Sequence, residues 1–133
     1  MALIANNIVV RFGATQILHG VDFAASAGTF SAIIGPNGSG KTTLLRAMTG
    51  EIGYDGTVQI NGKDTQHVAP EVLAKERAVL AQSTQLAFPF TVLEVVRLGL
   101  TAGVATGEAS EAADLAFQAL VRVGLVGFEG RFF

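Results

Sequence analysis

One segment constrains this chain more than any other: residues 35–42, Gly-Pro-Asn-Gly-Ser-Gly-Lys-Thr, fit the pattern G-x-x-x-x-G-K-[ST] at every position. The continuous apolar run 30–35 (FSAIIG) precedes it and predicts a strand buried on both faces of a parallel sheet. After the loop, the helical spacing of Leu44, Leu45 and Met48 predicts a helix that ends near Gly50. A strand, a glycine-rich loop and a helix in this order indicate a phosphate-binding loop. The alternative is a glycine-rich turn without a ligand.

The residue types of this loop suit a phosphate. Glycines let the backbone curl so that several N–H groups point at one anion, and the N-terminus of the following helix adds partial positive charge. Lys41 supplies a full charge to the β and γ phosphates, and the Thr42 hydroxyl is placed to bind Mg²⁺. The predicted phosphate-binding set is Gly35, Pro36, Asn37, Gly38, Ser39, Gly40, Lys41, Thr42 and Thr43.

Length and composition limit what else the chain can be. Its 133 residues make one domain at most, and 50% hydrophobic with only 15% charged residues predicts an ordered core. A formal net charge of -2 gives no long-range attraction to nucleic acid, which is therefore not an expected partner. The absence of cysteine excludes a disulfide framework and thiolate metal sites. Glycine, glutamine and proline interrupt the longest charge-free stretches, so we expect no membrane span, and the first residues show no signal-peptide pattern.

The remaining pattern predicts strands first and helices later. Short β-branched runs between residues 3 and 25, with turns at Gly13 and Gly20, have antiparallel character. Residues 56–60 predict another strand, and Asn61-Gly62 predicts a type I′ hairpin turn after it. Pro70 is expected to begin a helix that continues through residues 71–77, before a strand at 78–81.

Two further helices are expected in the last third of the chain. Thr91 and Glu94 match a capping box at the start of a helix that runs to about Leu98, and a small-residue loop follows at 101–107. Residues 110–124 predict a second helix. Its expected apolar face consists of Leu115, Ala116, Ala119, Leu120 and Val123.

The residues around the phosphate-binding loop resemble one family. Residues 37–46 (NGSGKTTLLR), together with residues 17–23 (ILHGVDF), are similar to the nucleotide-binding subunits of ABC transporters. Within that family, residues 74–99 resemble the ATP-binding subunit of bacterial haem (hemin) importers, a relative of the siderophore and cobalamin importers. The resemblance covers essentially the whole chain. It implies an α/β P-loop NTPase fold, the ABC ATPase core with an antiparallel β subdomain, of which residues 1–133 would be the N-terminal part of a single nucleotide-binding domain.

The resemblance gives a role to two residues outside the loop. Phe12 sits where the family places an aromatic ring that stacks on adenine, and a ring face suits a base; the alternative is a core aromatic. Gln82 sits at the position of the Q-loop glutamine, which ligates Mg²⁺ or orients the attacking water. Here Ala81 replaces a proline common at that spot, and Gln85 is a nearby competitor. The alternative for Gln82 is a solvent-facing glutamine.

The segment 86–96 looks like the family segment that follows the Q-loop and faces the membrane subunit. Phe88 and Phe90 are either exposed anchors for that subunit or core residues. Residues 130–133 resemble the stretch just before the family's LSGGQ-type signature.

Several family elements do not occur in this sequence: the signature itself, the Walker B run that ends in Asp-Glu, and the switch histidine. None of the four aspartates follows an apolar run and precedes a glutamate, and His19 and His67 are misplaced for the switch. We therefore expect an N-terminal fragment, truncated before the signature and Walker B, that binds nucleotide at best and does not hydrolyse it alone.

The function that the resemblance implies for the complete subunit is MgATP binding and hydrolysis, an ATPase activity coupled to import of haem. The implied partners are integral-membrane permease subunits, a second copy of the subunit and, indirectly, a periplasmic binding protein. The implied location is peripheral, at the cytoplasmic face of the bacterial inner membrane. A siderophore or cobalamin importer ATPase and a non-hydrolysing nucleotide-binding module are the alternatives. A small-molecule kinase would need an arginine-rich lid, for which Arg97, Arg122 and Arg131 are too dispersed.

Overall fold

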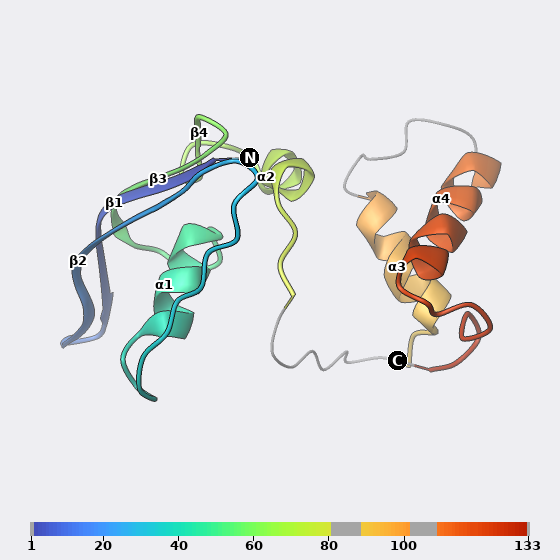
Figure 1. Ribbon diagram of the computed structural model, residues 1–133, viewed down its shortest axis with the longest axis horizontal. Coiled ribbons are helices and arrows are strands. Elements are labelled where there is room, and N and C mark those ends of the chain that lie inside the picture. The colour runs from blue at the N-terminus through green and yellow to red at the C-terminus, as the bar shows by residue number, and fades with distance from the viewer. Residues whose placement is uncertain (1, 81–88, 102–108, 133) are drawn as a thin grey trace. The chain divides into compact units, whose positions relative to one another are not determined.

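The computed structural model describes residues 2–80, 89–101 and 109–132, and within them the chain forms two compact units (Figure 1). Unit 1 spans Met1–Val79 and unit 2 spans Leu80–Phe133. Whether residues 1–133 belong to a single nucleotide-binding domain stays a prediction. The elements are, in chain order, β1 (Leu3–Phe12), β2 (Thr15–Ala25), α1 (Lys41–Met48), β3 (Asp55–Ile60), β4 (Lys63–Asp64), α2 (Pro70–Glu76), α3 (Val92–Thr101) and α4 (Ala109–Arg122).

Unit 1 is built on a four-stranded sheet in the order β2-β1-β3-β4, with every neighbouring pair antiparallel. The antiparallel strands predicted between residues 3 and 25 are confirmed as β1 and β2, and the turn predicted at Gly13 joins them; the turn predicted at Gly20 is wrong, because Gly20 lies inside β2. The predicted hairpin turn joins β3 and β4: Asn61 and Gly62 both have positive φ, 51° and 79°, as a type I′ turn requires.

The core of unit 1 lies between this sheet and α1. Ile8, Val10 and Leu18 from the strands are buried in one cluster with residues of α1 that recur at helical spacing. These helix residues are Leu44, Ala47 and Met48. The helix predicted after the loop is thereby confirmed, and Gly50 follows it with φ 75°. Burial of this apolar stripe fixes α1, and with it the loop that ends at Lys41, against one face of the sheet.

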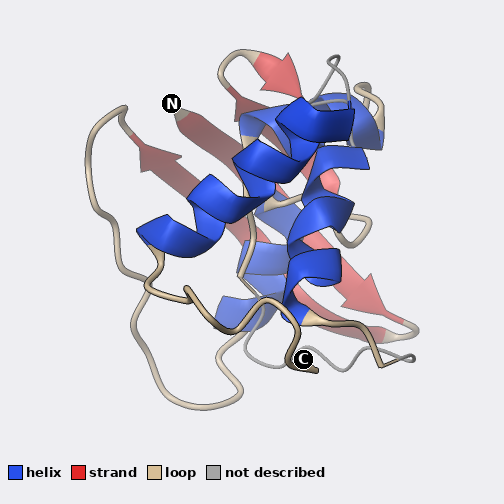
Figure 2. Ribbon diagram, turned by 90° about the vertical axis from the view of Figure 1, so that its right-hand side faces the viewer, coloured by secondary structure: helices blue, strands red, loops and turns tan. Residues whose placement is uncertain are grey.

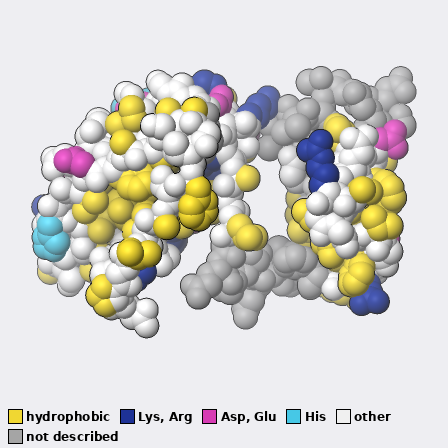
Figure 3. All heavy atoms as spheres, in the orientation of Figure 1, with side chains coloured by type: hydrophobic (Ala, Val, Ile, Leu, Met, Phe, Trp, Pro, Cys, Tyr) yellow, Lys and Arg dark blue, Asp and Glu magenta, His cyan; other side chains and the backbone are white. Residues whose placement is uncertain are grey.

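The strand predicted at residues 30–35 is wrong for the part of the chain that the structure describes. These residues form an irregular connection between β2 and α1. Ile33 packs against the core, whereas Phe30 and Ile34 are 95% and 90% exposed. A strand needs neighbours that pair with its N–H and C=O groups, and the described residues place none beside this segment. Hydrophobic side chains accordingly gather on the face of unit 1 seen in Figure 3.

The helix predicted near Pro70 is confirmed as α2, with Pro70 in its first turn and Leu73 buried. The strand predicted at 78–81 is wrong within the described residues, because positions 78–80 have no strand pairing and Leu80 is 95% exposed. Ala81 lies outside the described residues.

Unit 2 contains α3 and α4, which lie side by side in Figure 2, where this unit faces the viewer. The predicted capping box at the start of α3 is confirmed: the Thr91 N–H donates to Glu94 Oε2 at 2.7 Å, and the Glu94 N–H donates to Thr91 Oγ1 at 3.3 Å. The Thr91 hydroxyl also donates to Glu94 Oε2, at 2.7 Å, and the bonds that the carboxylate accepts from the Thr91 N–H and hydroxyl, in that order of effect, lower the pKa of the Glu94 carboxyl.

The chain after α4 returns to the start of α3. The N–H groups of Val92 and Leu93 donate to the carbonyls of Arg131 and Glu129 at 2.8 and 3.1 Å. Arg131 also places its guanidinium 4.2 Å from the centroid of the Phe128 ring. The backbone bonds thus join the chain after α4 to the first turn of α3 within unit 2.

The apolar face predicted for the last helix is only partly correct. Ala116 and Leu120 are buried, but Leu115, Ala119 and Val123 are exposed, the last of them beyond the helix end. The predicted loop at 101–107 falls almost wholly outside the described residues, and Thr101 is the last residue of α3. None of the described helices is long and apolar enough to cross a membrane.

Candidate functional site

The candidate site is the loop of residues 35–42, which leads into α1. Gly38 and Gly40 have φ of 81° and 89°, a backbone conformation that side chains with a Cβ rarely adopt. A Cβ added to Gly38 would meet no atom within 4 Å, so its glycine serves the backbone turn alone. The Ser39 N–H donates to the Pro36 carbonyl at 3.3 Å inside the turn. The glycine spacing of the sequence pattern therefore corresponds to real turns of the chain.

Gly40 also sets how closely the loop approaches the sheet. A Cβ at this position would lie 2.9 Å from Leu18 Cδ2 and 3.6 Å from Ile17 Cγ2 on β2. The 2.9 Å separation is closer than real Cβ atoms approach other atoms, so a side chain here would have to displace the buried Leu18 side chain or move the loop away from β2. Gly40 is the N-cap of α1, and its left-handed conformation starts the helix directly on the strand surface.

The N-terminus of α1 presents unpaired backbone donors. The first backbone bond of the helix runs from the Leu44 N–H to the Gly40 carbonyl at 2.8 Å, so the N–H groups of Lys41, Thr42 and Thr43 have no acceptor within the helix. No side chain caps this end, and its first turn holds no acidic residue. Such an end favours an anion, because its N–H groups and the helix dipole both present positive charge.

Lys41 adds a full positive charge at the same place. Its Nζ donates to the Gly35 carbonyl at 2.8 Å and to the Pro36 carbonyl at 2.6 Å. An ammonium has three N–H donors, so one remains for a ligand oxygen while the two loop bonds persist. The side chain thus folds back over its own loop and holds the charge next to the open N–H groups of α1.

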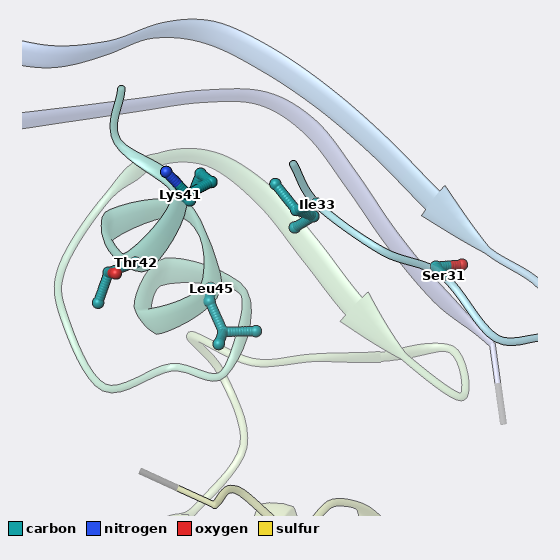
Figure 4. A pocket seen from close by; sticks show the side chains of 5 residues that line it. All are labelled: Ser31, Ile33, Lys41, Thr42 and Leu45. Atoms are coloured by element: carbon teal, nitrogen blue, oxygen red, sulfur yellow. The ribbon is translucent and has the colours of Figure 1, made fainter. Parts of the chain in front are cut away.

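A pocket of about 300 Å³ opens beside this end of α1 (Figure 4). Lys41, Thr42 and Leu45 line it from the helix, and Ser31 and Ile33 line it from the segment that faces the helix. Among these five residues, Lys41 is the only charged one. The pocket therefore combines one cation, two hydroxyls and an apolar wall.

Phe12 is the last residue of β1, and 54% of its surface is exposed. That exposure argues against the alternative that Phe12 is a core aromatic. Val10, two residues earlier, is buried in the core that contacts α1, and it pairs with Leu18, the residue against which Gly40 packs. Phe12 therefore lies two residues along β1 from Val10, whose partner Leu18 contacts the phosphate-binding loop at Gly40.

The other residues singled out from the sequence are not among those that line this pocket, or they lie outside the described residues. Gln82, Gln85 and Phe88 fall in the segment 81–88, which the structure does not describe, so the Q-loop assignment stays a prediction. Phe90 is half-buried. His67 contacts the Asp64 carboxylate at 3.2 Å, in a turn after β4, consistent with the interpretation of this histidine as an ordinary turn residue.

Sequence reasoning missed two kinds of residue. Ser31 and Ile33 line the pocket although their segment looked like a buried strand. Asn6 and Asn7 interrupt β1, where Asn7 has φ 52° and the pairing register shifts. Two consecutive asparagines inside a strand are the signal that would have revealed this irregularity.

The described residues offer limited protein ligation to a metal ion. No group of three or more His, Cys, Asp and Glu side chains gathers anywhere in the described ranges. The Thr42 hydroxyl is exposed and lies in the pocket beside Lys41. One hydroxyl beside a phosphate site fits Mg²⁺, which usually takes one or two protein oxygens and obtains its other ligands from phosphates and water.

Comparison with known proteins places this geometry in context. A protein-family model described as "ABC transporter" matches residues 18–133. The hemin import ATP-binding protein HmuV of Roseobacter denitrificans is 54% identical over 133 residues, which are 100% of this chain and 49% of that protein. The protein of the same name from a Jannaschia species is 56% identical over 131 residues, covering 98% of this chain and 47% of that protein. The chain thus spans about half the length of the curated relatives it matches.

Solved structures give the same fold. A nucleotide-free ATP-binding cassette from an ABC transporter superposes with a TM-score of 0.78 and 31% identity, over 98% of this chain and 57% of that one. The ATP-binding subunit of another ABC transporter superposes with a TM-score of 0.81 and 25% identity, over 99% of this chain and 54% of that one.

Proposed function

Because the chain belongs to the ABC transporter family, we propose that its loop 35–42 and the start of α1 bind the phosphates of ATP. The observation that carries this proposal is the open N-terminus of α1, with no cap and no acidic residue in its first turn. Lys41 stands beside it with one N–H donor to spare. The family and this geometry point to the same anion.

The residues of the loop have different roles in phosphate binding. Gly38 and Gly40 shape the turn, and Gly40 seats it on β2. The N–H groups of Lys41, Thr42 and Thr43 donate to phosphate oxygens, and the Lys41 ammonium neutralises the β and γ phosphates. The other predicted members, Gly35, Pro36, Asn37 and Ser39, supply the curved backbone around the anion. Phe12 stacks on the adenine ring.

Mg²⁺ is the metal that this pocket fits, with the Thr42 hydroxyl as its protein ligand and Gln82 as a second ligand or as the residue that orients the attacking water. When bound, Mg²⁺ would neutralise charge on the β and γ phosphates. The hydroxyl would also orient the nucleotide, because a ligand at the first turn of α1 fixes where the phosphates lie relative to Lys41.

For the whole protein we propose an ATP-binding subunit of a bacterial importer of hemin. Relatives that are 54% and 56% identical are named hemin import ATP-binding proteins, which supports this cargo over siderophores or cobalamin. Hydrolysis would then drive import through integral-membrane permease subunits, with a second copy of the subunit and indirectly a periplasmic binding protein. The site of action would be peripheral, at the cytoplasmic face of the inner membrane.

The proposal is tested in two steps. Isothermal titration of the chain with ATP, ADP and inorganic phosphate first asks whether a nucleotide binds, and Lys41→Ala should remove most of the affinity. Phosphate release is then compared between this chain and a chain of the relatives' full length. Binding without turnover in the longer chain, even with the permease present, would instead favour a non-hydrolysing nucleotide module.

A further inference from the structure

We propose that the irregularity of β1 at Asn6–Asn7 is a positioning device, because it places the ring of Phe12 on the sheet face that carries the phosphate-binding loop. This inference rests on the proposed function, since a ring that stacks on a base must lie on the same side of the sheet as the phosphates. Asn6 and Asn7 themselves need not touch the nucleotide.

The irregularity is a β-bulge that β1 shows toward both of its neighbours. Toward β3, Asn6 pairs with Thr57 and the next paired residue, Val9, pairs with Asp55. Three steps along β1 therefore match two steps along β3. Toward β2, the pairs Ala5–Phe23 and Ile8–Val21 show the same extra residue on β1, and the next pair, Val9–His19, leaves Gly20 as an extra residue on β2. Asn7 carries the extra turn with φ 52°, a conformation that asparagine tolerates better than most residues.

The extra residue changes which side chains face α1. Before the bulge the buried residue is the odd-numbered Ala5, and after it the buried residues are the even-numbered Ile8 and Val10. A further register shift lies between Val10 and Arg11, but its extra residue is on β2, where the pairing moves from Leu18 to Gln16. Side chains on β1 itself therefore keep alternating, and Phe12 continues the face of Ile8 and Val10. Uninterrupted alternation from Ala5 would place Arg11 on that face instead and would turn Phe12 to the opposite one.

The opposite face of β1 carries Arg11, as the alternation after the bulge requires. Arg11 donates from Nη1 to Asp55 Oδ2 at 3.1 Å, and both side chains are more than half exposed. These two residues line a separate hollow of about 240 Å³ together with Val9, Gly53 and Tyr54. Arg11 therefore points away from the core that holds Val10, and by alternation Phe12 lies on the other side of β1 from Arg11.

The face that Phe12 shares is the face on which the phosphate-binding loop rests. Gly40 packs against Leu18, and Leu18 is the pairing partner of Val10. Phe12 lies two residues farther along β1, about 7 Å at the rise of an antiparallel strand. In Figure 1 the β1–β2 hairpin and the loop before α1 lie at the same end of unit 1.

Both neighbouring strands are built to accept the bulge. On β2, Asp22 accepts the Asn7 N–H through Oδ1 at 2.7 Å, and a Cβ on Gly20 would lie 2.7 Å from Asn7 Oδ1. On β3, a Cβ on Gly56 would lie 2.5 Å from the Asn7 carbonyl oxygen and 2.6 Å from that of Asn6. Asp22 thus supplies an acceptor for the extra residue, and Gly20 and Gly56 leave the space that it occupies.

The test separates the base from the phosphates. ATP and inorganic tripolyphosphate are titrated by calorimetry into the full chain and into Asp22→Ala, which removes the acceptor of the Asn7 N–H. We expect ATP affinity to fall by at least about threefold. Complete loss of one base stack would lower it by roughly 5- to 150-fold. Tripolyphosphate affinity should stay within about twofold. Asp22→Asn keeps an acceptor oxygen and should restore ATP binding.

Two glycine variants on and before β3 test the same point without changing Asp22. Gly56→Ala places a methyl group against the bulge, whereas at Gly53, three residues earlier, a Cβ would meet nothing within 4 Å. Gly56→Ala should lower ATP affinity more than tripolyphosphate affinity, and Gly53→Ala should leave both unchanged. If Gly56→Ala fails to fold, the Asp22 variants decide the question.

A double-mutant cycle shows whether the bulge acts through the ring. In a Phe12→Ala background, Asp22→Ala should cause no further loss of ATP affinity. Additive losses, or equal losses for ATP and tripolyphosphate, would mean that the bulge supports only the stability of the sheet, and the proposal would be overturned. If the unaltered chain binds neither ligand, the proposed function itself fails; if it binds both equally, the stacking role of Phe12 fails.

Discussion

Replacement of Lys41 by alanine tests the phosphate site most directly, and the size of its effect follows from the structure. Two of the three ammonium donors are held by the carbonyls of Gly35 and Pro36, so one is left for a phosphate oxygen. A hydrogen bond between charged groups contributes up to about 3 kcal/mol. Loss of that bond would raise the dissociation constant for MgATP by roughly 150-fold.

Thermal melting converts this loss into a measurable shift. At a hundred times its dissociation constant, MgATP should stabilise the unaltered chain by about 2.7 kcal/mol. For a domain of this size that corresponds to a rise in Tm of roughly 10 °C. At the same ligand concentration Lys41→Ala would retain only about 0.3 kcal/mol, a rise of roughly 1 °C. Without ligand the exposed bonds of Lys41 contribute little, so both proteins should melt at similar temperatures.

Lys75→Ala is the matched control, because it removes the same charge from an exposed position on α2. It should keep the full ligand-induced shift. Equal shifts in the unaltered chain and in Lys41→Ala would refute the assignment of this loop to phosphate binding. A large loss of Tm in ligand-free Lys41→Ala would instead show that the two loop bonds hold the fold.

Three further predictions follow from the geometry. Phe12→Ala should weaken ATP binding by roughly 1 to 3 kcal/mol while Phe12→Tyr is nearly silent in calorimetry, because the half-exposed ring is proposed to stack on adenine and both rings offer a stacking face; unfolding of both variants would contradict stacking. Gly40→Ala should cost about 1 to 3 kcal/mol more in chemical denaturation than Gly38→Ala, because both strain φ but only the first meets Leu18; equal costs would contradict the close approach. The lowered pKa of the Glu94 carboxyl stabilises unit 2 above about pH 4.3 and that stabilisation is lost as the pH falls further, so the melting temperatures of the unaltered chain and Glu94→Gln should converge in acid.

The features that sequence reasoning predicted correctly depend on neighbours close in the chain. The capping box of α3 involves two residues three positions apart, and the β3–β4 turn needs only two consecutive residues with positive φ. The helix after Lys41 follows from its own apolar spacing and from the glycine before it. Local hydrogen bonds and backbone preferences decide these elements, so a single sequence contains enough information to predict them.

The features that it missed depend on other strands. The bulge in β1 is stabilised by an acceptor fifteen residues away on β2 and by a glycine on β3, so the strand's own residues reveal only that Asn6 and Asn7 break the alternation. The role of Gly40 has the same origin. Its backbone conformation follows from the loop pattern, but its need to lack a side chain follows from Leu18, which lies on another element.

The segment 30–35 shows most clearly the difference between what neighbours in the chain decide and what other strands decide. Its continuous apolar character predicts burial on both faces, and burial on both faces requires pairing with strands on either side. The described residues provide none, and so Ile33 packs on the core of unit 1 while Phe30 and Ile34 remain almost fully exposed. Within the described residues, Gly38 and Gly40 keep their positive φ although the segment before them forms no strand. This loop conformation, together with the packing of α1 against β1 and β2, places Lys41 at the uncapped N-terminus of α1.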